Sequence, residues 1–297
     1  MTELGLDHAT PIPVFLLTGF LGSGKTSLLN RMIAVGGPRT AVIINEFGDV
    51  PIDNDLVQIN GEDTSFAETS TGCICCEPGN DIVSTLTRLS EAMDEGQTGT
   101  VERVVIETTG LADPAPIINQ MLIASSYSIA GRYFSLAAVI TTLDALRGEA
   151  TIEERLLAHK QLAFANRIAL TKADMLPSHA TERRAALAGL IERINPAAQI
   201  LDIQDPLAQP QTLLSPGRYA PDSQGADVLG WLSAESPLAK AFGDKPASQW
   251  IPGNRHSDIY TKSLVVNGSV TQRQLTSFLD MLYHAGGDRL LRLKGLV

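Results

Sequence analysis

One octapeptide near the start of the chain constrains its fold more than any other stretch. Gly19-Phe20-Leu21-Gly22-Ser23-Gly24-Lys25-Thr26 matches the phosphate-loop pattern GxxxxGK[ST] at every specified position. Residues 14–17 before it are apolar, as in a buried strand, and residues 27–33 after it carry apolar side chains at helical spacing. A strand, a glycine-rich loop and a helix in this order wrap a phosphate in backbone N–H groups at a helix N-terminus. The sequence therefore predicts a nucleoside-phosphate site here.

The polar residues of this loop have separate expected roles. We expect Lys25 to reach the β- and γ-phosphates and the Thr26 hydroxyl to ligate Mg²⁺. Glycines are needed because side chains would keep the backbone from closing around the anion.

A second element of phosphate chemistry is predicted at residues 103–110. Three β-branched residues lead to Glu107, and Gly110 follows three positions later. An acid at a strand end can meet Mg²⁺ directly or through water, and the N–H of the following glycine can contact a γ-phosphate. Many strands end in an acid, but the position downstream of a phosphate loop favours the functional interpretation.

A third motif, Thr171-Lys172-Ala173-Asp174, follows a short strand and is similar to the guanine-reading pattern [NT]KxD. In that pattern the aspartate accepts hydrogen bonds from two guanine donors that adenine does not offer together, and the lysine stem lies along the base. We expect Thr171, Lys172 and Asp174 to form the base site.

The order of predicted elements indicates the fold class. Strands alternate with helices, which favours an α/β P-loop NTPase with a mainly parallel sheet flanked by helices. Its ligands should lie at the carboxyl ends of the strands. Residues 45–72 are expected to be irregular. The predicted strands are 14–18, 40–44, 103–106, 136–140, 167–170 and 199–203, and the predicted helices are 81–93, 153–165 and 180–194.

The chain divides into four expected parts. Residues 1–12 are a loose leader, and 13–203 form the nucleotide-binding domain. Residues 204–257 contain seven prolines without a sustained period and are interpreted as a linker with short helical pieces. Residues 258–297, with strands at 262–266 and 289–297 and a helix at 271–283, predict a small α+β domain that is incomplete.

Composition excludes several classes of partner. A net charge of −10 and a pI near 5.0, without a basic run, argue against nucleic-acid binding. No apolar run approaches the roughly 18 residues of a membrane span, and the N-terminal residues lack the pattern of a signal peptide. We therefore expect a cytoplasmic protein without a membrane or nucleic-acid partner.

All three cysteines lie within four residues, at Cys73, Cys75 and Cys76. They can supply three ligands of a tetrahedral site for Zn²⁺, Cu(I) or Co²⁺. Glu46, Glu77 or a histidine can supply the fourth ligand, and Glu46 is our first candidate. A redox pair, or small buried residues without a ligand, are the alternatives.

Five segments together resemble the CobW-type metallochaperone GTPases, a group whose strand-end acid is glutamate and which is related to the urease and hydrogenase nickel-insertion GTPases. Two further stretches, residues 195–198 and 291–295, are also similar to family segments, and the likeness extends over nearly the whole chain from Pro13. The five segments are GFLGSGKT, NEFGDVPID (45–53), GCICC (72–76), ETTGLADP (107–114) and TKAD.

This resemblance implies that GTP binding shapes a metal site at the cysteines and that hydrolysis releases Zn²⁺ or Co²⁺ to a client metalloprotein. Related GTPases often dimerise across the nucleotide site, so a homodimer is one expectation, while the sequence itself leaves the oligomeric state open. Carried over by position, Lys25, Asp49 and Glu107 are catalytic, and Thr26, Asp49 and Glu107 hold Mg²⁺. The expected nucleotide-binding residues are Gly22, Ser23, Gly24, Lys25, Thr26, Ser27, Gly110, Thr171, Lys172 and Asp174. The implied cargo ligands are Cys73, Cys75 and Cys76, to which we add Glu46 as the candidate fourth ligand.

Three departures from the family pattern qualify these expectations. Thr171 stands where asparagine is common, which weakens the case for guanine selectivity. A histidine-rich stretch is absent from the sequence, so metal storage is not expected. The family's C-terminal domain normally continues beyond Arg-Leu-Lys-Gly, whereas this sequence ends at Val297.

Two other functions remain open at this stage. A P-loop ATPase or small-molecule kinase would show no preference for guanine nucleotides. A nucleotide-gated activator of a partner enzyme would bind nucleotide without coupling to a metal. No water-activating glutamine or arginine finger can be assigned, so slow intrinsic turnover is expected.

Overall fold

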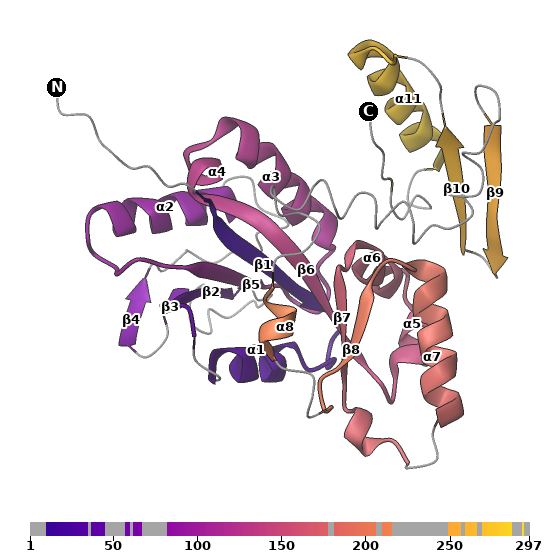
Figure 1. Ribbon diagram of the computed structural model, residues 1–297, viewed down its shortest axis with the longest axis horizontal. Helices are drawn as coiled ribbons and strands as arrows, with labels where there is room; N and C mark the ends of the chain where they lie inside the picture. The colour runs from indigo at the N-terminus through magenta and orange to yellow at the C-terminus, as the bar shows by residue number, and fades with distance from the viewer. Residues whose placement is uncertain are drawn as a thin grey trace.

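The computed structural model is centred on one twisted sheet with helices on both faces (Figure 1). It describes residues 10–34, 37–44, 57–59, 62–66, 82–177, 181–205, 210–215, 249–256, 259–265, 269–286 and 293. Within these residues the sheet has eight strands in the order β4-β3-β2-β5-β1-β6-β7-β8. The strands are β1 (Ile12–Gly19), β2 (Thr40–Ile44), β3 (Val57–Ile59), β4 (Glu62–Phe66), β5 (Arg103–Glu107), β6 (Phe134–Asp144), β7 (Arg167–Thr171) and β8 (Gln199–Asp202).

The strands from β2 to β8 in this order pair in parallel, which confirms the predicted fold class. The hairpin β3–β4 continues the sheet beyond β2 with antiparallel pairing. It lies in the stretch 45–72 that we expected to be irregular, and that expectation was wrong at these residues. The hairpin strands Val-Gln-Ile and Glu-Asp-Thr-Ser-Phe are short and lack the apolar run of the parallel strands, so only the pairing of β3 with the edge of β2 reveals them.

Helices connect the parallel strands and cover both faces of the sheet. Figure 1 shows α2, α3 and α4 on one side and α1 and α8 on the other. The helices are α1 (Lys25–Ala34), α2 (Ile82–Asp94), α3 (Pro114–Tyr127), α4 (Ile129–Tyr133), α5 (Gly148–Glu154), α6 (Leu156–Phe164), α7 (Thr181–Ile194) and α8 (Pro210–Leu213), with a 3₁₀ turn η1 (Ala173–Met175).

Two helical regions differ from expectation. The single helix predicted over 153–165 is two helices, because Arg155 has an extended backbone (φ −127°, ψ 106°) that ends α5 and precedes α6. The break lets Ile152 and Leu162 enter the same core cluster. Helix α3 was not among the predicted elements, although Asp113 caps its N-terminus by accepting from the Ala115 N–H at 3.0 Å, and proline follows at the first helical position.

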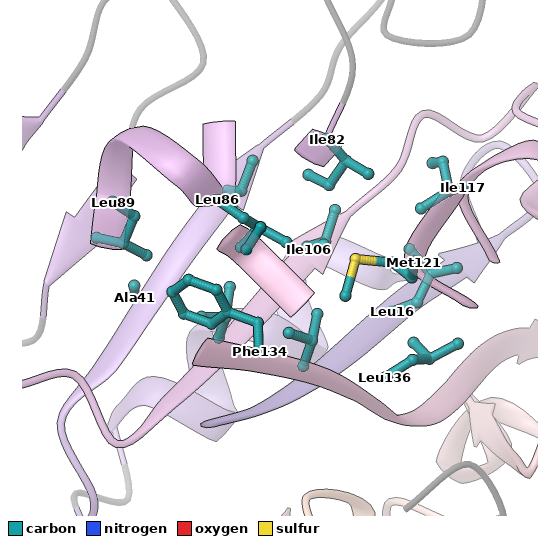
Figure 2. Close-up of a cluster of buried hydrophobic side chains, with 14 of the residues drawn as sticks. Leu16, Ala41, Ile82, Leu86, Leu89, Ile106, Ile117, Met121, Phe134 and Leu136 are labelled. Atoms are coloured by element: carbon teal, nitrogen blue, oxygen red, sulfur yellow. The ribbon is translucent and has the colours of Figure 1, made fainter. Parts of the chain in front are cut away.

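The alternation of side chains along the central strand explains why both faces need helices. Val14 and Leu16 of β1 point into one core cluster, and Phe15 and Leu17 point into another. Because successive side chains of a strand point to opposite faces, a continuous apolar run requires cover on both sides. Figure 2 shows the first cluster, where Leu86 of α2 and Met121 of α3 lie with the strand residues Leu16 and Ile106, and Leu89 of α2 lies near Ala41 of β2.

A second, two-stranded sheet pairs β9 (Gln249–His256) with β10 (Ile259–Val265) in antiparallel fashion, and α11 (Gln272–Gly286) follows. The predicted strand at 262–266 and helix at 271–283 correspond to β10 and α11. Strand β9 lies in the stretch interpreted as a linker. Its proline and glycine interrupt the sequence pattern of a strand, so its pairing with β10 was not predicted. The strand predicted at 289–297 lies outside the described residues except for Leu293. None of the described helices has the length and apolar character needed to span a lipid bilayer.

The core assignment predicts a large difference between two leucine substitutions. Leu86 is fully buried and Leu122 of α3 is 44% exposed. We expect Leu86→Ala to lower the free energy of unfolding by about 2–5 kcal/mol, because it removes buried methyl groups and leaves a cavity. Leu122→Ala makes the same change at the surface and should cost about 0.5 kcal/mol or less. Urea unfolding followed by circular dichroism measures both, and equal losses would contradict the assignment.

Candidate functional site

The phosphate loop joins the carboxyl end of β1 to the first residue of α1. Three of its glycines have positive φ, at +141° for Gly19, +71° for Gly22 and +89° for Gly24. Residues with a Cβ rarely adopt these conformations, so the glycine positions of the motif set the backbone path of the loop. Ser27 lies exposed in the first turn of α1.

The loop lysine is held within the loop. Lys25 is 8% exposed, and its Nζ donates to the backbone oxygen of Gly19 at 2.9 Å and to that of Phe20 at 3.4 Å. These bonds place a buried positive charge at the N-terminus of α1, where backbone N–H groups also favour an anion.

A hydroxyl and a carboxylate meet directly beneath the loop. The Thr26 Oγ1 donates to Oε1 of Glu107 at 2.8 Å, although the two residues are far apart in the sequence. Glu107 ends β5 and is 5% exposed. Oxygen ligands of this kind suit Mg²⁺, which is commonly held by one or two protein groups together with substrate phosphates. The donor set at this point therefore fits the predicted Mg²⁺ site.

The turn after β5 lies against the phosphate loop at Gly110. A Cβ at Gly110 would lie 2.6 Å from the Leu21 nitrogen and 2.8 Å from its Cα. This approach is possible only without a side chain. Just before this turn, Thr108 is hydrogen-bonded to β1, because its N–H donates to the Leu17 oxygen at 3.0 Å.

The predicted base motif is bonded to the other side of the phosphate loop. Thr171 is buried, and its hydroxyl donates to the Ser23 oxygen at 2.7 Å. Lys172 has a left-handed backbone (φ +56°), and its Nζ donates to the Gly22 oxygen at 2.8 Å. Thr171 thus serves as a tether of the phosphate loop. Asp174, the last residue of the motif, is exposed in η1.

Two supporting residues were missed in the sequence. Asp144 ends β6 and accepts from the Lys172 Nζ at 2.7 Å, and it also accepts from the Leu146 N–H at 2.7 Å. Gln161 of α6 reaches the turn after β5. The position of Asp144 at the end of a strand is the sequence feature that could have identified it. For Gln161 the only sequence feature is a glutamine beside apolar residues in a helix, which is a weak indication.

The predicted cargo ligands and one predicted catalytic acid cannot be placed. Glu46, Asp49, Cys73, Cys75 and Cys76 all lie outside the described residues. Among the residues that are described, no group of three or more His, Cys, Asp or Glu side chains could hold a metal ion.

With this geometry in view, the similarity to known proteins can be stated. Residues 13–202 match the family model of the CobW/HypB/UreG nucleotide-binding domain. The chain belongs to this family.

Relatives within the family are named for zinc and for GTP hydrolysis. The zinc chaperone YjiA of Escherichia coli (strain K12) is 31% identical over 291 residues, which cover 97% of this chain and 82% of that protein. The zinc chaperone CobW of Sinorhizobium sp is 32% identical over 56% of this chain and 52% of its own length. The zinc-regulated GTPase metalloprotein activator 1 of Dictyostelium discoideum is 28% identical over 90% and 63%, respectively.

A crystal structure of the Zn(II)-bound YjiA GTPase from E. coli also matches. Its TM-score is 0.49 and its sequence identity is 36%, over 66% of this chain and 58% of that chain.

The close approach at Gly110 gives a testable expectation. Gly110→Ala should lower the free energy of unfolding by about 1–3 kcal/mol, because the added methyl group overlaps the Leu21 backbone. Gly189→Ala is the matched control, since Gly189 lies inside α7 and its Cβ would meet only an Arg193 nitrogen at 3.9 Å. The control should be stabilised by roughly 0.5–1 kcal/mol. Thermal unfolding measures both variants, and midpoints that shift in the same direction would contradict this packing.

Proposed function

We propose that this protein is a Mg²⁺-dependent GTPase that binds Zn²⁺ or Co²⁺ in a GTP-dependent way and delivers the metal to a client metalloprotein. The observation that carries the proposal is the bond between Thr26 and Glu107 under a complete phosphate loop. Family membership and the zinc-related names of the relatives support the choice of cargo. Cytoplasmic location and a homodimer belong to the same proposal.

In this proposal the phosphates lie in the loop formed by Gly22, Ser23 and Gly24. Lys25 neutralises charge on the β- and γ-phosphates, and Ser27 contributes at the helix N-terminus. Thr26 and Glu107, with Asp49, hold Mg²⁺, which when bound supplies positive charge to the oxygens of the transferred phosphoryl group. The Gly110 N–H faces the γ-phosphate.

Guanine is selected by Asp174 in this proposal, with the Lys172 stem along the base. The bonds from Thr171 and Lys172 to the phosphate loop support this placement, because they fix the base motif relative to the phosphates. A base and a phosphate held at a fixed separation favour one nucleotide over a free phosphate.

In this proposal, nucleotide binding is coupled to cargo-metal binding because the segment that carries the cargo ligands follows β2. Ile44, the last residue of β2, pairs with Glu107 in the parallel register. The chain that carries Glu46, Asp49 and the three cysteines therefore begins beside the proposed Mg²⁺ site. A change in γ-phosphate contacts there can bias the thiolate geometry, and such coupling between two ligands is reciprocal.

The role of the negative charge on Glu107, at the end of β5, can be tested with one substitution. We expect Glu107→Gln to lower single-turnover GTP hydrolysis by about 100-fold, because the amide keeps the size and can still accept from Thr26 but has lost its negative charge. Glu102→Gln makes the same change just before the opposite end of β5, where Glu102 accepts from the Arg39 N–H, and should leave the rate near that of the unaltered protein. Equal rates in the two variants would remove Glu107 from the mechanism.

Metal coupling is tested by Zn²⁺ and Co²⁺ affinity under reducing conditions, measured by competition with a chromophoric chelator. Mg²⁺ is present with GTPγS, GDP, ATPγS or no nucleotide. We expect binding about tenfold tighter with GTPγS, within the usual range of coupling between sites. Cys75→Ser should abolish the gain, and comparison of Glu46→Gln with Glu77→Gln identifies the fourth ligand.

Three outcomes would contradict parts of this proposal. Affinity that is indifferent to nucleotide would overturn the coupling and favour a nucleotide-gated activator of a partner enzyme. An equal gain with ATPγS would favour a P-loop ATPase or kinase. Metal binding unaffected by Cys75→Ser would leave the cysteines structural or redox-active.

A further inference from the structure

Two side chains of helix α6 hold the turn after β5. The Gln161 Nε2 donates to the backbone oxygens of Gly110 at 3.3 Å and Ala112 at 3.1 Å. Gln161 is 1% exposed, so both bonds are shielded from water. The neighbouring Lys160 forms an ion pair with Asp113 at 2.9 Å. Two consecutive residues of α6 therefore hold residues 110–113 at both ends.

The turn itself is compact and has contacts on both sides. The Ala112 N–H donates to the Thr109 oxygen at 3.2 Å, and the Leu111 N–H donates to the Thr109 hydroxyl at 3.3 Å. One side of Gly110 approaches the Leu21 backbone, while its carbonyl oxygen accepts from Gln161. The peptide group between Gly110 and Leu111 is thus oriented by Gln161 and Thr109. The preceding peptide group, which carries the Gly110 N–H, is held through the Thr109 oxygen by the N–H of Ala112, whose own oxygen accepts from Gln161.

The helix that carries Gln161 is itself fixed to the sheet. The Thr141 hydroxyl of β6 donates to the backbone oxygen of Gln161 at 2.8 Å. At the end of α6, the Asn195 Nδ2 donates to the oxygens of Leu162 and Ala165, both at 2.8 Å. A side chain that is buried on a well-anchored helix can hold a turn in one geometry, as a functional site requires.

We propose that Gln161 is a positioning residue for γ-phosphate recognition, which it serves by holding the turn so that the Gly110 N–H faces a nucleoside triphosphate in the loop. This inference rests on the proposed role of Gly110 in nucleotide binding. A nucleoside diphosphate has no group at that position. Gln161 should therefore affect the binding and hydrolysis of triphosphates and leave diphosphate binding unchanged.

The test compares Gln161→Met with Asn195→Leu in the full chain. Each substitution replaces a buried amide that donates to backbone oxygens by an apolar side chain, so both should lower the thermal midpoint. Fluorescence titration gives the affinity for GTPγS relative to GDP, and for ATPγS relative to ADP. We expect Gln161→Met to lower the triphosphate preference and the single-turnover rate by about tenfold or more, as small misplacements of a reacting group do.

Asn195→Leu should leave the triphosphate preference within about twofold of the unaltered protein, since its bonds reach only the C-terminal end of α6 and Gln161 keeps both its anchor from Thr141 and its bonds to the turn. Lys160→Gln removes the ion pair with Asp113 at the other end of the same turn, so it should lower the triphosphate preference severalfold. Because Lys160 is partly exposed, this variant tests the inference if Gln161→Met does not fold. An unchanged preference in the folded Gln161→Met variant, or an equal loss in Asn195→Leu, would overturn the inference.

The nucleotide pairs separate this inference from the proposed function. If the unaltered protein prefers triphosphates only with adenine, guanine specificity fails and the effect of Gln161 is measured on the adenine pair. If it distinguishes triphosphate from diphosphate with neither base, the γ-phosphate role of Gly110 and the role of Gln161 both fail. If the unaltered protein prefers GTPγS to GDP and the folded Gln161→Met variant keeps that preference unchanged, only the inference fails.

Discussion

The site depends on a contact between the first turn of α1 and the end of β5. The Thr26 hydroxyl reaches the Glu107 carboxylate only because β1 and β5 are parallel neighbours whose carboxyl ends lie at the same edge, with Leu17 opposite Glu107 in the register. A shift of one residue in that register would point the acid to the other face of the sheet. The buried alternation along β1 and β5 fixes the register, so the apolar core sets the geometry of the polar site.

The phosphate loop is held by neighbours on several sides before any ligand binds. The Ser23 hydroxyl bonds to the Thr142 hydroxyl at 2.6 Å, and the Thr171 hydroxyl bonds to the Ser23 oxygen. Lys172 spans from the Gly22 oxygen to Asp144 and does so with a left-handed backbone. Strain of this kind persists only where the surroundings over-determine it, and it is often found at functional sites. A loop ordered in advance loses less conformational entropy when a nucleotide binds.

How far the sequence could predict this structure depended on whether a feature was local. The strand, loop and helix around Lys25 and the strand ending at Glu107 follow from apolar runs and glycine positions, and the family resemblance followed from such local segments. The hairpin β3–β4 and strand β9 were missed because their pairing partners, not their own patterns, make them strands. The same limit applies to the site, since the bonds of Thr171 and Gln161 join residues that no periodicity connects.

Helix α6 shows how a single element can serve both halves of such a site. Its polar residues Lys160 and Gln161 hold the turn after β5, while the chain that follows it enters β7 and leads to the base motif. At the start of that strand Asn166 accepts from the Val139 N–H at 2.7 Å, which fixes β7 against β6. A displacement of the turn by the γ-phosphate would therefore push against a helix whose C-terminal half is anchored by Thr141 and Asn195. The far end of the turn is tied to the same helix, because Lys160 pairs with Asp113, the N-cap of α3, so α6 links the start of α3 to the turn that carries Gly110.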